Sequence, residues 1–402
     1  MSGPAEDSVN TAKGLTSEQT LALILPPNVA HAYAGHLVDE NGIDYIDMVS
    51  AWGTNILGYG HPGVAKAIAA QAGKYANIGM AGPEYSRLYH LLLDKIPCAE
   101  ALHFMKNGSD ATASAVRLAR FATRRDKVLH FGYHGVQDWY MASIAVPGVP
   151  QSHYGEIVTL QALDLACVTK AFNEHPGQIA CLMIDPMLCV AASAAQMREI
   201  AELVQSCGAL LVFDEVVSGF RVSVGGMQEV WGVTPDLACY GKGIANGMPL
   251  SVLAGREKWM RHIAAINYSL TFGLEAVSMA AAIATIEEIV EKNVCAALAA
   301  KGRRLKNAYA DLCRKHGVAS VLTGHDTRPQ LHFDPAPAVA ADVLHYIAIQ
   351  ELARQRICTY GIFSFCHAHD ENDLSMLIQG LDIALEKVSW TIEVNAPAVS
   401  AA

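Results

Sequence analysis

Between about residues 100 and 255, short apolar runs alternate with helical segments, and this alternation constrains the fold more than any other feature. The strand-like runs are 101–105, 127–131, 179–184 and 210–213. Segments with helical spacing, such as 110–121 and 196–206, separate them. Continuous apolar strands joined by helices are typical of a mostly parallel sheet that is covered on both faces. We therefore expect an α/β protein with its ligand-binding residues at the carboxyl ends of these strands.

The two ends of the chain have a different pattern. Before residue 50, the Asn41-Gly42 step between two alternating runs predicts a β-hairpin. Beyond about residue 275 we predict a long helical region over 277–315, a strand pair around Gly324 and Pro329, and two more helices. Those helices span 340–356 and 371–388. At 402 residues the chain is too long for one small core. We predict a large domain over 51–290 and a smaller C-terminal α/β domain over 291–402, with residues 1–50 packing against the smaller one.

Composition excludes several classes of partner and location. Hydrophobic residues make up 52% of the chain, and 29 basic against 39 acidic residues give a net charge of −10. This balance argues against nucleic acid or an anionic membrane as the main partner. No segment has the ~18 consecutive apolar residues of a membrane-spanning helix, and residues 1–7 do not resemble a signal peptide. Because the ten cysteines are scattered without a C-x-x-C pair, we expect reduced thiols and a cytoplasmic protein.

Lys242 is the first candidate for chemistry. It stands between Gly241 and Gly243, and glycines allow a flat ligand to approach the backbone closely. An apolar setting disfavours the ammonium form of lysine and frees the amine to attack a carbonyl. Lysine forms the Schiff base with pyridoxal phosphate, whose ring nitrogen needs an acidic partner. A solvated loop lysine is the alternative interpretation.

That acidic partner could be Asp214, which directly follows the predicted strand 210–213. A carboxylate there would keep the ring nitrogen protonated, so that the ring accepts electrons after proton removal. Val216, two residues on, would point the same way in an extended strand and could press against the ring. A structural ion pair between Asp214 and Arg221 is the alternative.

Two further clusters begin where predicted strands end. Asn107, Gly108 and Ser109 open the predicted helix 110–121, and the start of a helix binds phosphate through free N–H groups. An ordinary helix cap would explain the same residues. The second cluster contains Tyr133 and His134, and an aromatic ring there could stack on a planar cofactor. A loop packed by its own rings remains the alternative.

The chain thus contains a candidate amine, a carboxylate, a stacking ring and a phosphate-binding helix start, which we call the phosphate cup (Asn107, Gly108 and Ser109). With these four features it resembles the class-III aminotransferases, which are dimers of the fold-type I pyridoxal-phosphate family. The likeness extends from about residue 35 to 388 and is most specific in four motifs. These are Asn55-Ile56-Leu57-Gly58-Tyr59-Gly60-His61-Pro62, Tyr133-His134-Gly135, Asp214-Glu215-Val216 and Lys242-Gly243. Within the family the chain is most similar to the branch that contains glutamate-1-semialdehyde aminomutase.

The resemblance implies a role for each matched position. Lys242 matches the Schiff-base lysine and proton shuttle, and Asp214 the partner of the ring nitrogen. The remaining cofactor-binding positions are Asn107, Gly108, Ser109, Tyr133, His134, Val216 and Thr271. Thr271 matches a threonine that reaches the phosphate of the neighbouring subunit, which would make a homodimer with shared active sites. Trp52 falls where the family lines the substrate pocket with an aromatic residue.

The chain departs from the aminomutase in one respect. That enzyme carries an arginine near its N-terminus that holds the substrate carboxylate, and residues 25–31 contain none. Arg328 is a candidate for binding a carboxylate in the C-terminal domain, with a surface arginine as the alternative. His367 and His369 suggest a metal, but a loop and a helix cap explain them better, so we expect no metal.

These features predict an aminotransferase that moves an amino group from a donor to an aldehyde, ketone or oxo acid in two half-reactions. An intramolecular aminomutase or an amino-group epimerase would use the same residues. A cofactor-binding protein without turnover is a further alternative, which the intact pair of Lys242 and Asp214 disfavours.

Overall fold

The computed structural model describes residues 28–336 and 338–396. The chain divides into two compact units by its internal contacts. Unit 1 comprises residues 1–61 together with 297–402, and unit 2 comprises 62–296. The sequence-predicted boundaries at residues 50 and 290 remain predictions. The predicted absence of a signal peptide at residues 1–7, and part of the arginine-free stretch 25–31, lie outside the described residues.

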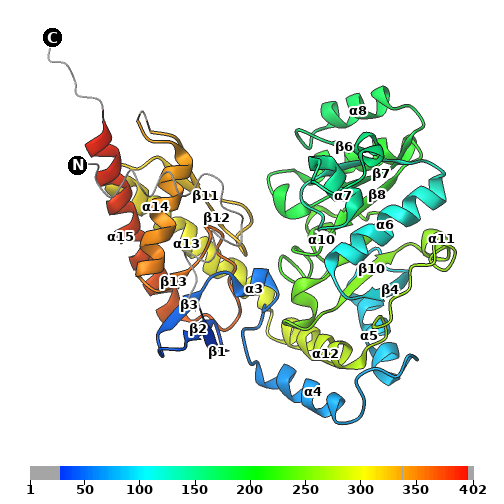
Figure 1. Cartoon of the computed structure of the whole chain (residues 1–402), viewed down its shortest axis with the longest axis horizontal. Helices are drawn as coiled ribbons and strands as arrows, with labels where there is room; N and C mark the ends of the chain where they lie inside the picture. The colour runs from blue at the N-terminus through cyan, green and yellow to red at the C-terminus, as the bar shows by residue number, and fades with distance from the viewer. Residues whose placement is uncertain (1–27, 337, 397–402) are drawn as a thin grey trace. The chain divides into compact units, whose positions relative to one another are not determined.

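Unit 2 is built on a seven-stranded sheet in the order β4-β10-β9-β8-β7-β5-β6. Figure 1 labels β4, β10, β8, β7 and β6 of this sheet. The strands are β4 (Ala101–Met105), β5 (Lys127–Phe131), β6 (Ile157–Thr159), β7 (Ile179–Ile184), β8 (Leu210–Asp214), β9 (Leu237–Tyr240) and β10 (Ser251–Gly255). Strands β9, β8, β7, β5 and β6 run parallel, and β10 is antiparallel to both of its neighbours. The prediction of a mostly parallel sheet in an α/β fold is confirmed.

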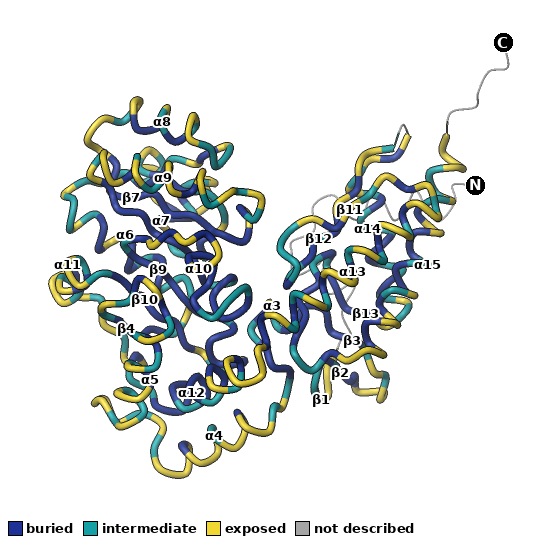
Figure 2. The backbone as a smooth tube through the Cα atoms, turned by 180° about the vertical axis from the view of Figure 1, so that it is seen from behind, coloured by how far each residue is buried: buried dark blue, intermediate teal, exposed yellow. Residues whose placement is uncertain are grey.

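Helices cover this sheet and join its strands. They are α4 (Pro62–Ala72), α5 (Pro83–Lys95), α6 (Gly108–Thr123), α7 (Asp138–Met141), α8 (Leu165–Glu174), α9 (Ala194–Ser206), α10 (Met227–Trp231), α11 (Glu257–Met260) and α12 (Ala276–Glu291). Short 3₁₀ helices include η3 (Pro186–Leu188) and η4 (Lys242–Ala245). Because both sheet faces are covered, every residue of β7, β8 and β9 is buried. Figure 2 shows β7 and β9 in the dark blue of buried residues.

Unit 1 contains a four-stranded sheet in the order β1-β2-β3-β13 and a separate strand pair. The strands are β1 (Val29–Tyr33), β2 (His36–Asp39), β3 (Asp44–Asp47), β13 (Ile357–Cys358), β11 (Ser320–Thr323) and β12 (Gln330–Phe333). The predicted hairpin is confirmed, since β2 pairs antiparallel with β3 and Gly42 turns the chain at φ +78°. The predicted strand pair around Gly324 and Pro329 is confirmed as β11 and β12.

The helices of unit 1 are α3 (Ser50–Gly53), α14 (Ala341–Arg354) and α15 (Glu371–Asn395), and α13 (Val294–His316) crosses the boundary between the units. The prediction of one helical region over 277–315 is wrong in one respect. The chain breaks between α12 and α13, where Asn293 adopts φ +50°. Asparagine tolerates this left-handed conformation, which ends a helix even where the apolar periodicity continues. Helix α15 extends to Asn395, beyond the predicted end at 388.

Within residues 28–336 and 338–396, no helix is both long and apolar enough to cross a membrane. All ten cysteines are free thiols, and most of them are buried.

Candidate active site

Lys242 follows strand β9 after a single glycine and begins the short helix η4. Its backbone has φ +45°, a conformation that costs free energy for any residue with a Cβ and is concentrated at functional sites. A Cβ added to Gly241 would lie 3.4 Å from Val216 Cγ1 and 3.7 Å from the Cα of Gly108. The lysine segment therefore begins directly beside two other predicted site residues.

The predicted phosphate cup lies at the start of α6, a helix of 16 residues. A Cβ on Gly108 would come within 2.8 Å of Val216 Cγ1, so only glycine fits without displacing the valine. The Asp110 carboxylate accepts a 2.8 Å hydrogen bond from the backbone N–H of Asn107, and the hydroxyl of Ser251 donates to the Asn107 carbonyl at 2.7 Å. These bonds explain Asn107 as a structural cap. They also fix the helix N-terminus where an anion would be favoured.

The loop after β5 packs against this helix start. Gly132 and Gly135 adopt φ +111° and +102°, and a Cβ on Gly135 would lie 2.7 Å from the Ser109 hydroxyl oxygen. The hydroxyl of Thr112 in α6 donates to the backbone carbonyl of His134 at 2.8 Å. Tyr133, on the same loop, keeps about half of its surface exposed (54%). This exposed ring is available to a ligand.

Asp214 and His134 form a buried pair. His134 Nδ1 lies 2.8 Å from Asp214 Oδ2, and the Val216 backbone N–H donates to Asp214 Oδ1 at 3.2 Å. Within the described residues, His134 Nε2 is buried without a hydrogen-bond partner. A proton on that atom would be an unsatisfied buried donor, so we assign the proton to Nδ1, which donates to the carboxylate. The Trp139 ring stacks on the imidazole at 5.9 Å.

Val216 reaches the site by a different route from the one predicted. Strand β8 ends at Asp214, so the strand alternation that was used to orient Val216 does not extend that far. Its side chain nevertheless lies against Gly108 and Gly241.

One buried carboxylate near this cluster was missed by sequence reasoning. Asp185 follows β7 and accepts a 3.0 Å hydrogen bond from the Met187 backbone N–H. Burial, and after it the negative charge of Asp214, raise the pKa of its carboxyl to about 6. The signal was present, because Asp185 follows an apolar strand in the same way as Asp214 does.

Thr271 lies on the surface of unit 2. Its carbonyl accepts a 3.2 Å hydrogen bond from the Asn77 side chain, and the Thr271 side chain is exposed. Glu275, four residues on, caps α12 and pairs with Lys106 at 2.9 Å. The start of α12 is therefore tied to Lys106, the residue before Asn107.

Trp52 and Arg328 belong to unit 1, where both side chains contact Tyr360. The Trp52 ring lies 5.0 Å from that of Tyr360, and the Arg328 guanidinium donates to the Tyr360 hydroxyl at 3.3 Å. Trp52 is 48% exposed and follows Ser50 and Ala51, all three with positive φ.

No group of three metal-binding side chains occurs in the part of the chain that the structure describes. The His369 imidazole accepts from the Cys366 backbone N–H at 3.0 Å, and Asp370 caps α15. By contrast, the residues of unit 2 fit pyridoxal phosphate. Gly108 and Gly241 let the backbone approach the Val216 side chain closely, a helix N-terminus suits the phosphate, and a lysine and a buried carboxylate belong to the same cluster.

Comparison with known proteins agrees with this fit. A sequence profile of the class-III aminotransferases matches residues 22–324. The 3-aminobutyryl-CoA aminotransferase of Cloacimonas acidaminovorans (strain Evry) is 31% identical over 368 residues, which cover 89% of this chain and 88% of that protein. The chain belongs to the class-III aminotransferase family.

Solved structures share the fold. The FumI protein of Sphingopyxis sp. MTA144, solved with pyridoxal phosphate, superposes with a TM-score of 0.84 at 27% identity, covering 98% of this chain and 97% of that one. An omega-transaminase from Sphaerobacter thermophilus gives a TM-score of 0.83 at 22% identity, covering 96% and 98%. The protein is thus a fold-type I, pyridoxal-phosphate-dependent aminotransferase, as the sequence predicted.

Proposed function

We propose that the protein moves an amino group between a small-molecule donor and an oxo acceptor at a site centred on Lys242. The observation that carries this proposal is the cluster of Lys242, Gly108 and Val216 beside the buried pair of Asp214 and His134. When bound, pyridoxal phosphate supplies an aldehyde that takes up the amino group and a ring that accepts electrons.

The residues of the chain have separate tasks in this proposal. Lys242 binds the cofactor aldehyde through Nζ and, once displaced by the donor, moves a proton with the same atom. Asp214 holds the proton on the ring nitrogen, and the Nδ1–H of His134 orients the carboxylate. Tyr133 and Val216 would hold the cofactor ring, and Asn107, Gly108 and Ser109 would hold its phosphate. Trp52 lines the substrate pocket, as the family resemblance implies.

Replacing the lysine tests the assignment. Lys242→Ala should abolish both turnover and the visible absorbance of the lysine-bound cofactor, since no other group takes its place. Lys66→Ala is the matched control, because Lys66 is an exposed lysine of unit 2. Transamination that survives in Lys242→Ala at the rate of the control would refute the proposal.

The donor class follows from the relative whose name states a substrate. That relative acts on 3-aminobutyryl-CoA, in which the amino group is on the third carbon. We propose that this protein also prefers donors whose amino group is not on the α-carbon. A screen of paired α- and β-amino donors, each with and without an oxo acid, tests this. A preference for α-amino donors would contradict it, and product formed without an oxo acid would indicate an intramolecular aminomutase.

We also propose that the enzyme is a homodimer in which Thr271 completes the site of the neighbouring subunit. The Thr271 side chain is exposed, and the apolar side chains of Phe272, Ile78 and Met80 are 57%, 45% and 66% exposed on the same and the adjoining segment. An exposed apolar cluster next to a site residue is suited to an interface.

Mixed dimers test the shared site. The Thr271→Ala homodimer should bind the cofactor weakly, and the Lys242→Ala homodimer should be inactive. A hybrid of the two has one intact site only if Thr271 acts across the interface, so mixing should restore activity. Hybrids without any gain, or a monomer in solution, would rule the arrangement out.

We propose a reducing compartment, the cytoplasm, on the basis of ten free thiols. Fractionation of cells that express a tagged protein tests this, and recovery outside the cytoplasm would contradict it.

A further inference from the structure

Asp185 lies beside Asp214 at the carboxyl edge of the sheet. Strands β7 and β8 are parallel neighbours, and the register pairs Ile184 with Phe213. The next residue of each strand is therefore a carboxylate. The backbone N–H of Asp185 also donates to the carbonyl of Phe131 at 2.9 Å, which ties it to the end of β5, the other neighbour of β7. Asp185 thus follows β7, the strand between β8, which ends at Asp214, and β5, which leads into the loop that carries His134.

The chain leaves room for Asp185 by placing a glycine opposite it. A Cβ on Gly132 would lie 2.4 Å from the Cβ of Asp185, which no side chain tolerates without displacement. Gly132 also has φ +111°, so any other residue there would be strained both by its backbone conformation and by the contact with Asp185. The Met187 backbone N–H fixes one carboxyl oxygen of Asp185 at 3.0 Å. A carboxyl that is only 8% exposed is therefore held in one position.

The charged groups that act on Asp185 are residues of the proposed cofactor site, namely Asp214, His134 and Lys242. The charge of Asp185 interacts unfavourably with Asp214 and favourably with His134 and Lys242. Asp185 also contributes to the raised pKa of Tyr140 and of the Cys189 thiol, although burial is the larger cause for both. Burial and the charge of Asp214 raise the pKa of Asp185 to about 6 from an ordinary 3.8. A group with this pKa changes its charge just below neutral pH.

We propose that Asp185 is a positioning residue that acts through Asp214 and adds a second negative charge behind it, strengthening the protonation of the cofactor ring nitrogen. The inference rests on the proposed function. Above about pH 6 Asp185 is charged and its potential favours the proton on the ring nitrogen. Below that pH, Asp185 takes up a proton and becomes neutral. The negative potential that it adds at the ring nitrogen is then lost.

Asp185→Asn is the test variant, because the amide oxygen can still accept from Met187 while the charge is gone. Asp164→Asn is the matched control in unit 2. Asp164 caps α8 through the backbone N–H of Cys167, and its pKa is lowered rather than raised by that bond. Both variants exchange an aspartate that binds a backbone N–H for its amide.

The first measurement uses the protein without cofactor, so it does not depend on catalysis. Since the folded-state pKa of Asp185 is raised, its contribution to stability is present below about pH 3.8 and is lost as the pH rises through about 6. Asp185→Asn should therefore gain stability relative to the native protein between those pH values and stay level above them. Asp164→Asn should show no such gain, because the lowered pKa of Asp164 has the opposite sign.

The second measurement uses the loaded enzyme. Above pH 6, Asp185→Asn should lower kcat about tenfold with little change in KM, the effect of one nearby charge worth about one pKa unit. The absorbance change that reports deprotonation of the cofactor ring should move to lower pH. Below pH 6 the rates of native enzyme and variant should converge.

Two results would overturn the inference. One is a stability profile for Asp185→Asn that runs parallel to the native one between pH 4 and 6. The other is a loaded enzyme whose kcat and ring titration are unchanged by the substitution. Failure of the proposed function is distinct, since it would appear as transamination in Lys242→Ala while the difference between the cofactor-free proteins persisted.

Discussion

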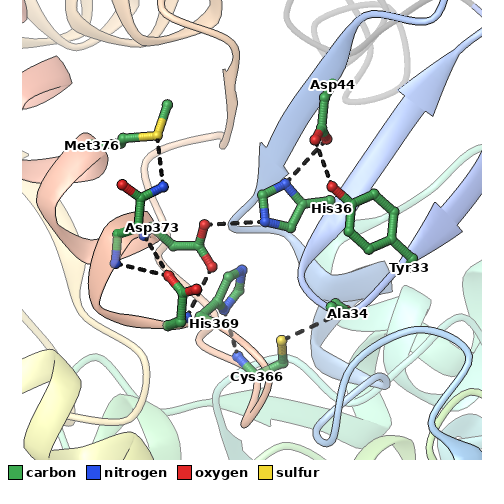
Figure 3. Close-up of polar contacts among 10 residues, drawn as sticks. Tyr33, Ala34, His36, Asp44, Cys366, His369, Asp373 and Met376 are labelled. Carbon is green, nitrogen blue, oxygen red and sulfur yellow. Dashed lines mark hydrogen bonds and ion pairs between the residues drawn. The ribbon is translucent and has the colours of Figure 1, made fainter.

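Each unit of the molecule contains a histidine bound to carboxylates, and the two arrangements differ in burial and in neighbours. In unit 2, His134 lies 2.8 Å from Asp214, with side-chain exposures of 0% and 7%. In unit 1, His36 bridges Asp44 and Asp373 at 3.1 Å each, and its own side chain is 19% exposed (Figure 3). The chemistry of the two contacts is the same, so their surroundings must decide what each does.

The surroundings differ in what else the carboxylates bind. Asp44 accepts a 2.6 Å hydrogen bond from the Tyr33 hydroxyl, and Asp373 completes the capping box of α15 with Asp370. Through His36, these carboxylates connect the hairpin of β2 and β3 to the start of α15, as Figure 3 shows. Asp214 instead lies at a strand end and accepts a hydrogen bond from the backbone of Val216, which packs against Gly108 and Gly241. We expect the pair in unit 2 to control chemistry and the pair in unit 1 to control stability.

Asp214→Asn should have the largest effect and tests the first half of the comparison. The amide keeps the shape of the carboxylate but cannot hold the ring nitrogen protonated, so kcat should fall on the order of a hundredfold or more. Thermal unfolding should change little, because removing a buried charge beside Asp185 relieves repulsion. The checks are steady-state kinetics and calorimetry. A variant with full activity would remove Asp214 from the site.

The strands and the site differ in how far sequence alone could predict them. The strands 101–105, 127–131 and 179–184 match β4, β5 and β7 at both ends, because each is a short, mostly apolar run. The break at Asn293 was missed because apolar periodicity continues through it. The left-handed turn at Ser50 was also missed, since contacts distant in sequence, such as the 2.7 Å bond from its hydroxyl to the Ser364 carbonyl, stabilise it.

The site shows the same limit. Lysine, aspartate and helix start were visible as local motifs, but the bond between His134 and Asp214 joins residues that are far apart in sequence. Asp185 was visible in the sequence as a carboxylate after an apolar strand, but its position beside Asp214 required the strand register. Local patterns thus predicted which residue types are present, and the sheet topology determines which of them interact.

Gly108→Ala tests the close approach of Gly108 to the Val216 side chain and should have an intermediate effect. Alanine near a helix start is normally neutral or favourable, but here its Cβ would lie 2.8 Å from Val216 Cγ1. Displacing the valine should weaken cofactor binding about tenfold, or about 1.4 kcal/mol, while the fold is retained. The dissociation constant can be measured by titrating the cofactor-free protein with pyridoxal phosphate.

Gly155→Ala is the control for this substitution, because nothing lies within 4 Å of its added Cβ and its φ is not positive. In the double variant Gly108→Ala/Val216→Ala the clash is removed, so the two effects should not add. Additive losses of affinity would show that the close approach of Gly108 to Val216 is irrelevant to the cofactor.

His36→Gln tests the second half of the comparison and should have the smallest effect. Hydrogen bonding to Asp373 is the largest cause that raises the pKa of His36 above its ordinary 6.5. A raised pKa means that the stabilisation is present below about pH 6.5 and disappears as the pH rises through the folded-state value. For a partly exposed pair we expect a loss of about 0.5–1 kcal/mol in unfolding free energy at pH 6, shrinking at higher pH, with kcat unchanged.

The matched control for His36→Gln is His332→Gln, since His332 lies 4.0 Å from Asp334 with side-chain exposures of 63% and 70%. That exposed pair should contribute no measurable stability at any pH. Denaturant unfolding of both variants between pH 5 and 9 makes the measurement. A loss for His36→Gln that is independent of pH would mean that the histidine acts through shape and not through charge. A fall in kcat for His36→Gln would contradict the expectation that the pair in unit 1 affects stability and not catalysis.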